Sequence, residues 1–415
     1  TSAMHVLAAA AAVGATVVSL AGQTDGGFSD GVGTVAQFNA PAAIDLDGNG
    51  NIIVADQFNK RIRRVTPDGA VTTLAGNDEG NYADGPGADA QFNNPTGVSV
   101  GLDGNIYVAD YQNGLVRRVL SDGGTTSTLA NHTFFSGPRD TAVDSKGGVY
   151  VTESGAGWVS KLTDTGRDPI VMGLSEPQGV AVDDKGNLYV CNYGRQRVEK
   201  VLPNGQMYTI GGNENYGVAD GLPGYAMFGR PAGIAVDGKG YVYVADVGTH
   251  RIRIISPEGY VGTIAGGNEG FADGPADTAR FDGPRGIATN GDGIVYVADW
   301  HNQRIRKIAG VDPRALTRPP IGIVRRDVSL GPGLPVPVGA NNPGLERVRV
   351  QFAGRTIAIR KVTFNDAGNR VVSIHLNGAA KRSVQRSSAT KFTIGGTMTD
   401  AAGTHTIPNY SLLAK

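Results

Sequence analysis

Residues 231–267, PAGIAVDGKGYVYVADVGTHRIRIISPEGYVGTIAGG, contain the pattern that decides the fold. The segments GIAVD and YVYVAD alternate apolar residues with others and are rich in Val, Ile and Tyr, as β-strands are. The DGKG sequence between them is typical of a hairpin turn. HRIRII predicts a third strand, and SPEG leads into a fourth, YVGTIAG. The stretch therefore predicts four short antiparallel strands joined by tight turns.

The same unit recurs through the first three-quarters of the chain. Each copy starts at a proline, followed by an apolar strand, an Asp/Gly turn and a second strand; the prolines are Pro41, Pro95, Pro138, Pro177, Pro231 and Pro284. A fourth strand follows every copy except the last, which stops at Gly310. Residues 16–22, TVVSLAG, match the fourth strand VTTLAG but have no first three strands before them. Because an N-terminal strand that completes the last blade removes exposed sheet edges, the sequence predicts an all-β, six-bladed β-propeller.

The repeated phrases Pro-x-Gly-[Ile/Val]-Ala-Val-Asp, Gly-Asn-x-Tyr-Val-Ala-Asp and Asn-x-Arg-Ile-Arg-Lys resemble the NHL repeat over about residues 16–310. The resemblance implies a six-bladed propeller, and most members of that family serve as binding platforms. A minority of related propellers are enzymes, including the peptidylglycine amidating lyase and metal-dependent lactonases. The repeat is thus specific for a fold and says little about function.

Charge and proline content divide the chain into an acidic body and a basic tail. An Ala-rich segment (1–15) precedes the propeller (16–310), a linker with seven prolines follows (311–344), and residues 345–415 predict a basic β-domain or docking arm. Residues 311–415 hold 15 basic and 5 acidic side chains; subtraction from 38 of each leaves 23 basic and 33 acidic before them. We expect the arm to dock on an acidic propeller, its own or a neighbouring subunit's, and so to build oligomers or fibres. Basic residues that alternate with apolar ones in strands argue against a nucleic-acid partner.

The compartment is indicated by few residues. Cys191 is alone, so it predicts no disulfide framework. Asn131 and Asn409 begin sequons for glycosylation. No apolar run reaches the roughly 20 residues that a membrane span needs. Together with an N-terminus that could be the remnant of a signal peptide, these features favour a secreted or cell-surface protein.

The candidate metal ligands are Asp45, Asp47 and Asn49, because residues 45–56 fit a calcium-loop template. The equivalent stretch of the fourth repeat, DDKGNLYV, is plainly a hairpin turn, so a structural turn is the alternative. The six histidines lack the spacing expected of a lyase-type propeller. We therefore predict no catalytic residues and no cofactor, with Ca²⁺ as the open possibility.

A recurring acid ends the second strand of the repeats, and a recurring arginine begins the third. The acids are Asp56, Asp110, Asp246 and Asp299, and the arginines Arg61, Arg197, Arg251 and Arg304. Recurrence from blade to blade predicts a structural ion pair that holds the turn between the two strands.

Departures from the repeat give the candidate binding residues. Repeats 3 and 4 follow unusually short loops and differ from the others at Arg139, Asp140, Glu153, Trp158 and Asn192. With Trp300 and His301 of the sixth repeat, these side chains predict a recognition groove on one rim. The preferred function is a non-enzymatic protein-binding and assembly module. The alternatives are a metal-dependent hydrolase or lyase with its site at the channel mouth, and a carbohydrate-binding propeller that uses Trp158 and Trp300 as stacking platforms.

Overall fold

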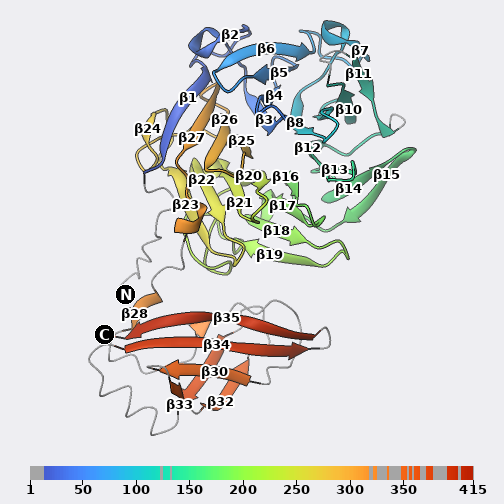
Figure 1. Ribbon diagram of the computed structural model, residues 1–415. Coiled ribbons are helices and arrows are strands. Elements are labelled where there is room, and N and C mark those ends of the chain that lie inside the picture. The colour runs from blue at the N-terminus through green and yellow to red at the C-terminus, as the bar shows by residue number, and fades with distance from the viewer. Residues whose placement is uncertain are drawn as a thin grey trace. The chain divides into compact units, whose positions relative to one another are not determined.

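The computed structural model describes residues 14–121, 125–130 and 133–316, and beyond them the backbone of strands between residues 321 and 414. Six antiparallel sheets stand around a central axis, which confirms the predicted six-bladed propeller (Figure 1). Blades 1 to 6 follow chain order. The predictions for the N-terminal segment 1–13 and for glycosylation at Asn131 and Asn409 concern residues or side chains outside the described part of the chain.

Each blade has four main strands. The inner strands are β3 (Pro41–Leu46), β8 (Pro95–Val100), β12 (Pro138–Val143), β16 (Pro177–Val182), β20 (Pro231–Val236) and β25 (Pro284–Thr289). The second strands are β4 (Ile52–Asp56), β9 (Ile106–Asp110), β13 (Val149–Glu153), β17 (Leu188–Asn192), β21 (Val242–Asp246) and β26 (Ile294–Asp299). The third strands are β5 (Arg61–Val65), β10 (Leu115–Val119), β14 (Trp158–Thr163), β18 (Arg197–Val201), β22 (Arg251–Ile255) and β27 (Arg304–Ala309). The outer strands are β6 (Ala70–Ala75), β11 (Thr125–Thr128), β15 (Gly166–Val171), β19 (Met207–Gly211), β23 (Val261–Gly266) and β1 (Thr16–Gly22), and blades 1, 2 and 6 add the short strands β2 (Gly31–Val32), β7 (Gly85–Pro86) and β24 (Gly274–Pro275).

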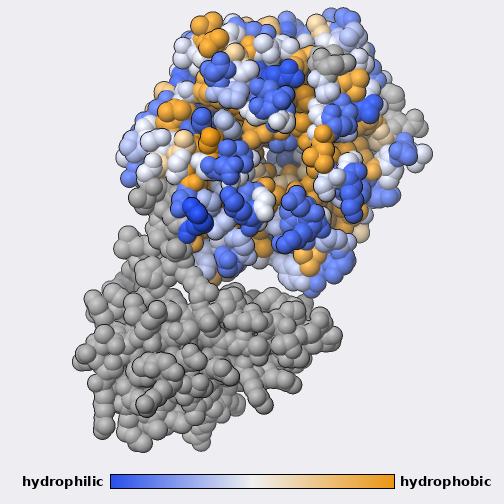
Figure 2. Space-filling model, in the orientation of Figure 1, coloured by the Kyte–Doolittle hydropathy of each residue, from blue (hydrophilic) through white to orange (hydrophobic). Residues whose placement is uncertain are grey.

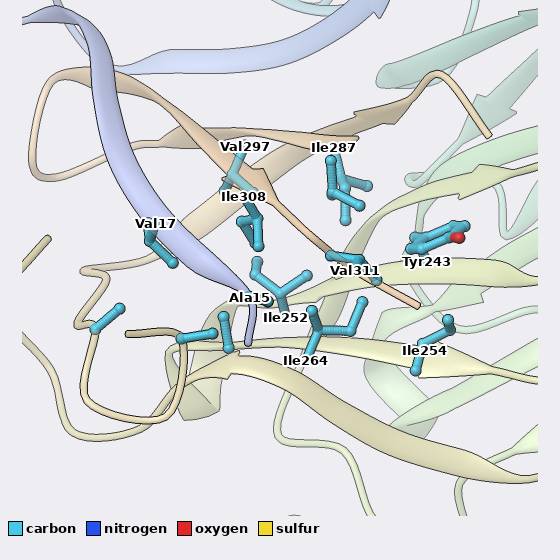
Figure 3. Packing of buried hydrophobic residues seen from close by; sticks show 14 of the residues in the cluster. Ala15, Val17, Tyr243, Ile252, Ile254, Ile264, Ile287, Val297, Ile308 and Val311 are labelled. Carbon is cyan, nitrogen blue, oxygen red and sulfur yellow. The ribbon is translucent and has the colours of Figure 1, made fainter. Parts of the chain in front are cut away.

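The N-terminal strand closes the ring, as predicted. Strand β1 pairs antiparallel with β27, Thr16 opposite Ala309 and Gly22 opposite Arg304. Val17 is fully buried and packs in the cluster that contains Ile308 and Val311 (Figure 3). The sixth blade therefore joins segments from both ends of the propeller sequence, and β1 covers the edge of β27 that would otherwise be unpaired.

The inner strands of neighbouring blades approach so closely that the third residue of the strand is normally glycine. A Cβ at Gly233 would lie 2.0 Å from the carbonyl oxygen of Arg285, and one at Gly179 would lie 2.3 Å from that of Ala232. Real Cβ atoms do not come that near to backbone. The exceptions at this position are Ala43 in blade 1 and Asp140 in blade 3.

A buried arginine holds four of the blades to the loops that precede them. It occupies the third position of the third strand in blades 1, 2, 5 and 6, and the four side chains are fully buried: Arg63, Arg117, Arg253 and Arg306. In blade 2, Nη1 of Arg117 lies 3.0 Å from Oδ2 of Asp110, and Nη2 lies 2.8 Å from Oδ1 of Asp84 in the preceding loop. The guanidinium also donates to the carbonyls of Ala83 and Gln91. One side chain thus ties together the second strand, the third strand and the loop from the previous blade.

The predicted partner of the recurring acid was therefore wrong by two residues. In blade 1 the acid Asp56 pairs with Arg63, whereas Arg61 reaches the exposed carboxylate of Asp78 at 2.7 Å. Positions one and three of the strand share one face, so sequence periodicity does not separate them. The third position lies beneath the loop, where the ion pair is shielded from water, and the first lies at the rim.

Blades 3 and 4 replace this arrangement. Ser160 and Glu199 stand where the other blades have the buried arginine. In blade 3 the guanidinium comes instead from the outer strand, since Nε of Arg167 lies 3.0 Å from Oε1 of Glu153. In blade 4, Asn192 donates to Glu199 at 3.3 Å.

The segment after residue 316 forms a separate compact unit. One sheet has the order β28 (Ile321–Val324), β35 (Gly403–Ala414), β34 (Thr390–Asp400), β30 (Arg347–Phe352) and β31 (Arg355–Ile357). A second sheet has the order β29 (Leu334–Pro335), β33 (Val371–Leu376) and β32 (Ile359–Phe364). Strands β32 and β33 pair antiparallel, with Phe364 opposite Val372.

The substitution Arg117→Met tests the buried arginine. Removing one partner of a buried ion pair leaves Asp110 and Asp84 without their cation, and such a change costs about 3–5 kcal/mol. We expect a clearly lowered midpoint of urea unfolding, measured by circular dichroism. The matched control is Arg118→Met on the same strand, where the side chain is only partly buried. Equal stability of the two variants would contradict the structural role given to Arg117.

Candidate functional site

A cavity of about 180 Å³ runs between the six inner strands. Its wall contains residues from β3, β8, β12, β16, β20 and β25, so it is the central channel of the propeller. One face of the molecule is hollowed at the centre of the ring, and hydrophobic residues gather around the hollow (Figure 2). One end of the channel lies near the turns between the second and third strands, and polar side chains line it there.

The second residue of each inner strand forms a ring near this opening. The six residues are Ala42, Thr96, Arg139, Gln178, Ala232 and Arg285. Arg139 and Arg285 belong to blades 3 and 6, which stand opposite each other in the ring. Nη2 of Arg285 crosses toward blade 4 and lies 3.4 Å from Oε1 of Gln178, and Nε of Arg139 donates to Oγ of Ser154 at 3.4 Å. Among the described residues, no carboxylate lies within 4.0 Å of either guanidinium.

Aromatic side chains from the turns between second and third strands flank both arginines. The guanidinium carbon of Arg139 lies 3.9 Å from the ring centre of Tyr111, and that of Arg285 lies 5.2 Å from the ring of Trp300. Trp300 is fixed in turn by a 3.1 Å hydrogen bond from Nε1 to Gln57. Tyr193 lies near both arginines. We call the set Tyr111, Arg139, Gln178, Tyr193, Arg285 and Trp300 the channel mouth.

Two carboxyl groups line the channel beyond the channel mouth. Asp140 accepts a 3.2 Å hydrogen bond from the backbone N–H of Val180 in the next blade, and Asp45 accepts one of 2.8 Å from Val100. Burial raises the pKa of Asp140 to about 8 and that of Asp45 to about 6, and the charge of Asp45 adds to the effect on Asp140. At neutral pH Asp140 is therefore largely protonated, although it follows Arg139 directly in the chain.

Burial also acts on the two arginines. It lowers the pKa of Arg285 to about 10, with a further contribution from the like charge of Arg139, and it lowers the pKa of Arg139. Both groups remain cationic at neutral pH. The channel mouth thus carries two positive charges without a carboxylate in ion-pair distance, although Glu176 favours the charged form of Arg139 and Asp140 that of Arg285 from farther away.

The structure separates the predicted binding residues into two groups. Arg139 and Asp140 line the channel, and Trp300 borders it. Glu153 and Asn192 are buried inside their blades, where they accept hydrogen bonds from the backbone of Ser136 and Ser175. Trp158 pairs with Glu153 at the start of β14, and neither it nor Glu153 or Asn192 lines the channel cavity. His301 is half-exposed, stacks on Trp300 and has Nδ1 2.9 Å from Asp282.

Sequence reasoning missed Tyr111, Gln178, Tyr193 and Arg285. Arg285 and Gln178 occupy the variable position of the Pro-x-Gly phrase, so neither departs from the repeat. A signal was present in that position, because aligning the six copies shows two arginines three blades apart. The two arginines indicate a shared site only once the second residue of each inner strand is known to line the channel.

The predicted calcium ligands Asp45, Asp47 and Asn49 have other places in the structure. Oδ1 of Asp47 accepts hydrogen bonds from the backbone of Asn49 and Asn51, which closes the hairpin turn, whereas Asp45 faces the channel. Across residues 14–121, 125–130 and 133–316, no three His, Cys, Asp or Glu side chains come together in a way that could hold a metal ion. A helix long and apolar enough to cross a membrane is likewise not found in the described residues.

The pH dependence of stability tests the environment of Asp140. Between pH 4 and 8 the folded chain keeps a proton on Asp140 that the unfolded chain releases, so this group's contribution to stability is present below pH 4 and is lost as the pH rises to about 8. The Asp140→Asn variant has no titrating carboxyl group at this position, so it does not lose stability in this way as the pH rises. We expect the Tm of the original chain to fall relative to that of Asp140→Asn by a few degrees between pH 5 and 8.5. The control Asp45→Asn should show its change below about pH 6. A Tm difference for Asp140→Asn that stays constant over the range would contradict the raised pKa.

Comparison with known proteins gives the repeat family. The NHL repeat profile matches residues 92–118, 174–200, 228–255 and 281–308. Suppressor of quenching 1, a chloroplast protein of Arabidopsis thaliana, is 31% identical over 104 residues, which are 25% of this chain and 10% of that protein. NHL repeat-containing protein 2 of Bos taurus is 25% identical over 312 residues, with 66% of this chain and 39% of that protein covered. The chain thus spans less than two-fifths of these curated relatives.

Solved structures give the same fold. A Bacteroides thetaiotaomicron protein of unknown function superposes with a TM-score of 0.60 at 22% identity, over 71% of this chain and 76% of the other. A Bacteroides ovatus structure described as an auxiliary nutrient binding protein gives 0.59 at 20% identity, with the same coverage. At this identity the likeness concerns the fold alone. Four blades of the six-bladed propeller, blades 2, 4, 5 and 6, therefore contain segments that match the NHL repeat.

Proposed function

We propose that the propeller is a binding module whose ligand enters the channel at the channel mouth. The observation that carries the proposal is the convergence of Arg139, Arg285 and three aromatic rings on an open cavity. Ligand sites are typically concave, with aromatic walls and a few polar groups that fix orientation. The channel mouth has this composition, and the remaining positions of its ring carry Ala, Thr and Gln.

A structural role explains this convergence poorly. Charged side chains that stabilise the blades have partners, as Arg117 has in Asp110 and Asp84. Arg139 and Arg285 have no such partner in the described part of the chain, so they cost stability through desolvation and mutual repulsion. A binding role accounts for that cost, because a ligand would supply the missing contacts.

A binding role also agrees with the name of the Bacteroides ovatus structure, an auxiliary nutrient binding protein with the same fold. A hydrolase or lyase that works at the same channel mouth is the alternative. Carbohydrate binding through both tryptophans is a weaker alternative, since Trp158 and Trp300 belong to blades 3 and 6 and only Trp300 borders the channel.

The wider role of the module remains as the sequence predicts it. Docking of the basic arm, assembly into oligomers or fibres, and a secreted or cell-surface location all depend on residues or partners beyond the described side chains. We keep them as proposals. The acidic balance of residues 1–310 supports the docking of a basic arm.

Tryptophan fluorescence tests the binding site, because the chain has two tryptophans and one borders the channel mouth. In the full-length Trp158→Phe variant, Trp300 is the sole reporter. We expect members of a panel of sugars, amines, carboxylates and phosphates to change its emission and to raise the Tm. The control is Trp300→Phe, where Trp158 reports and should respond weakly.

Two results would contradict the proposal. One is a panel in which no compound changes the emission of Trp300. The other is a compound that raises the Tm but changes the emission of Trp158 more than that of Trp300, which would place the site elsewhere.

A further inference from the structure

The hydrogen-bonding capacity of the channel mouth is mostly unused. Each guanidinium has five N–H donors. Within the described residues, Arg139 donates to one acceptor, Ser154, and Arg285 to one, Gln178, both at the long distance of 3.4 Å. By contrast, Arg117, which is fully buried whereas Arg139 and Arg285 are partly exposed, donates to two carboxylates and two carbonyls. The unused donors of Arg139 and Arg285 are therefore available to water or to a ligand in the channel.

Stacking decides which direction these donors face. Tyr111 covers the plane of Arg139, and Trp300 lies over Arg285. A guanidinium held by its face on an aromatic ring keeps its N–H groups at the edge, in the plane that a carboxylate or phosphate needs for paired hydrogen bonds. Since the Trp300 indole is itself anchored to Gln57, the position of Arg285 is set before any ligand arrives.

Two acids act on the arginines from beyond ion-pair distance, the exposed Glu176 on Arg139 and Asp140 on Arg285. The Asp140 carboxyl group is engaged by the backbone N–H of Val180, and burial raises its pKa to about 8. Asp45 has a pKa of about 6 and is engaged by the backbone N–H groups of Val100 and Leu46. The two arginines therefore dominate the charge of the channel mouth.

The size of the cavity limits what can enter. At about 180 Å³ it is smaller than the 300–1,000 Å³ of sites that enclose a drug-sized ligand. It can hold the charged head group of a small molecule, with the rest of that molecule near the aromatic rings at the rim.

From these observations we propose that Arg139 and Arg285 together hold a carboxylate or phosphate group of a small-molecule ligand. This inference rests on the proposed binding function and names the ligand class. The anion bridges blades 3 and 6 and supplies the negative charge that no carboxylate of the described residues places within ion-pair distance of the two arginines. Tyr111, Tyr193 and Trp300 contact the remainder of the ligand.

Three probes that share a benzene ring test the inference: phenyl phosphate, benzoate and the neutral benzyl alcohol. Isothermal titration of the full-length chain should show binding of one or both anions and at least tenfold weaker binding of benzyl alcohol. Because a hydrogen-bonded charge pair contributes about 1.5–3 kcal/mol, Arg139→Gln and Arg285→Gln should each weaken anion binding at least tenfold. The matched control is Arg195→Gln, which removes the same charge from an exposed residue of the same rim.

Folding of the variants is checked separately. Without ligand, Arg139→Gln and Arg285→Gln should be at least as stable to heat as the original chain, because each removes an uncompensated charge. Phenyl phosphate or benzoate should raise the Tm of the original chain and of Arg195→Gln but not that of the other two variants. This readout keeps the test independent of the calorimetric signal.

The outcomes separate this inference from the proposed function. Benzyl alcohol that binds as tightly as the anions, or anion binding that survives both arginine substitutions, would overturn the inference. If Trp300 still responded to neutral compounds, the binding function itself would stand. Absence of binding by either anion up to about 10 mM would also overturn the inference.

Discussion

The fully buried guanidinium on the third strand is the interaction on which most of the propeller depends. An isolated charge in that position would be strongly unfavourable, and it is tolerated because two carboxylates and two carbonyls surround it. One of those carboxylates, Asp30 in blade 1, also accepts a hydrogen bond from the backbone of Thr73 on the outer strand. The same few atoms therefore connect the loop before the blade with the second, third and outer strands of that blade. The loops before blades 1, 2, 5 and 6 each supply one carboxylate to this cluster: Asp30, Asp84, Asp220 and Asp273.

This arrangement also explains why blades 3 and 4 can have short loops. With Ser160 and Glu199 in place of the arginine, no loop carboxylate is needed. In blade 3, Arg167 pairs with Glu153 and donates to the carbonyl of Phe134 in the short loop, and in blade 4, Asn192 donates to Glu199. The departures at Glu153 and Asn192 are thus internal adjustments of the two blades. The departures at Arg139 and Asp140 are different, because both residues line the channel. Arg139 donates a hydrogen bond to Ser154 of its own blade, and Asp140 accepts one from the backbone of Val180 in blade 4.

The sequence predicted the architecture well because each level of the pattern was local. Pro-x-Gly, the Asp/Gly turns and the displaced strand at 16–22 specify strands, turns and closure without any knowledge of long-range contacts. The site was predicted less completely. Residues 139 and 285 are 146 positions apart, and each is unremarkable until the ring places blades 3 and 6 opposite one another. The ion-pair register failed for a related reason, since Arg61 and Arg63 lie on one face of a strand and only the overlying loop distinguishes them.

The central claim is that the channel mouth is built to hold an anion between Arg139 and Arg285. The most direct measurement is anomalous diffraction from crystals of the full-length protein soaked in tungstate, a heavy analogue of a phosphate-like oxyanion. The account predicts an anomalous peak between the two guanidiniums, within hydrogen-bonding distance of both, that is lost in crystals of Arg285→Gln. Peaks confined to other parts of the surface, with none at the channel mouth, would contradict it.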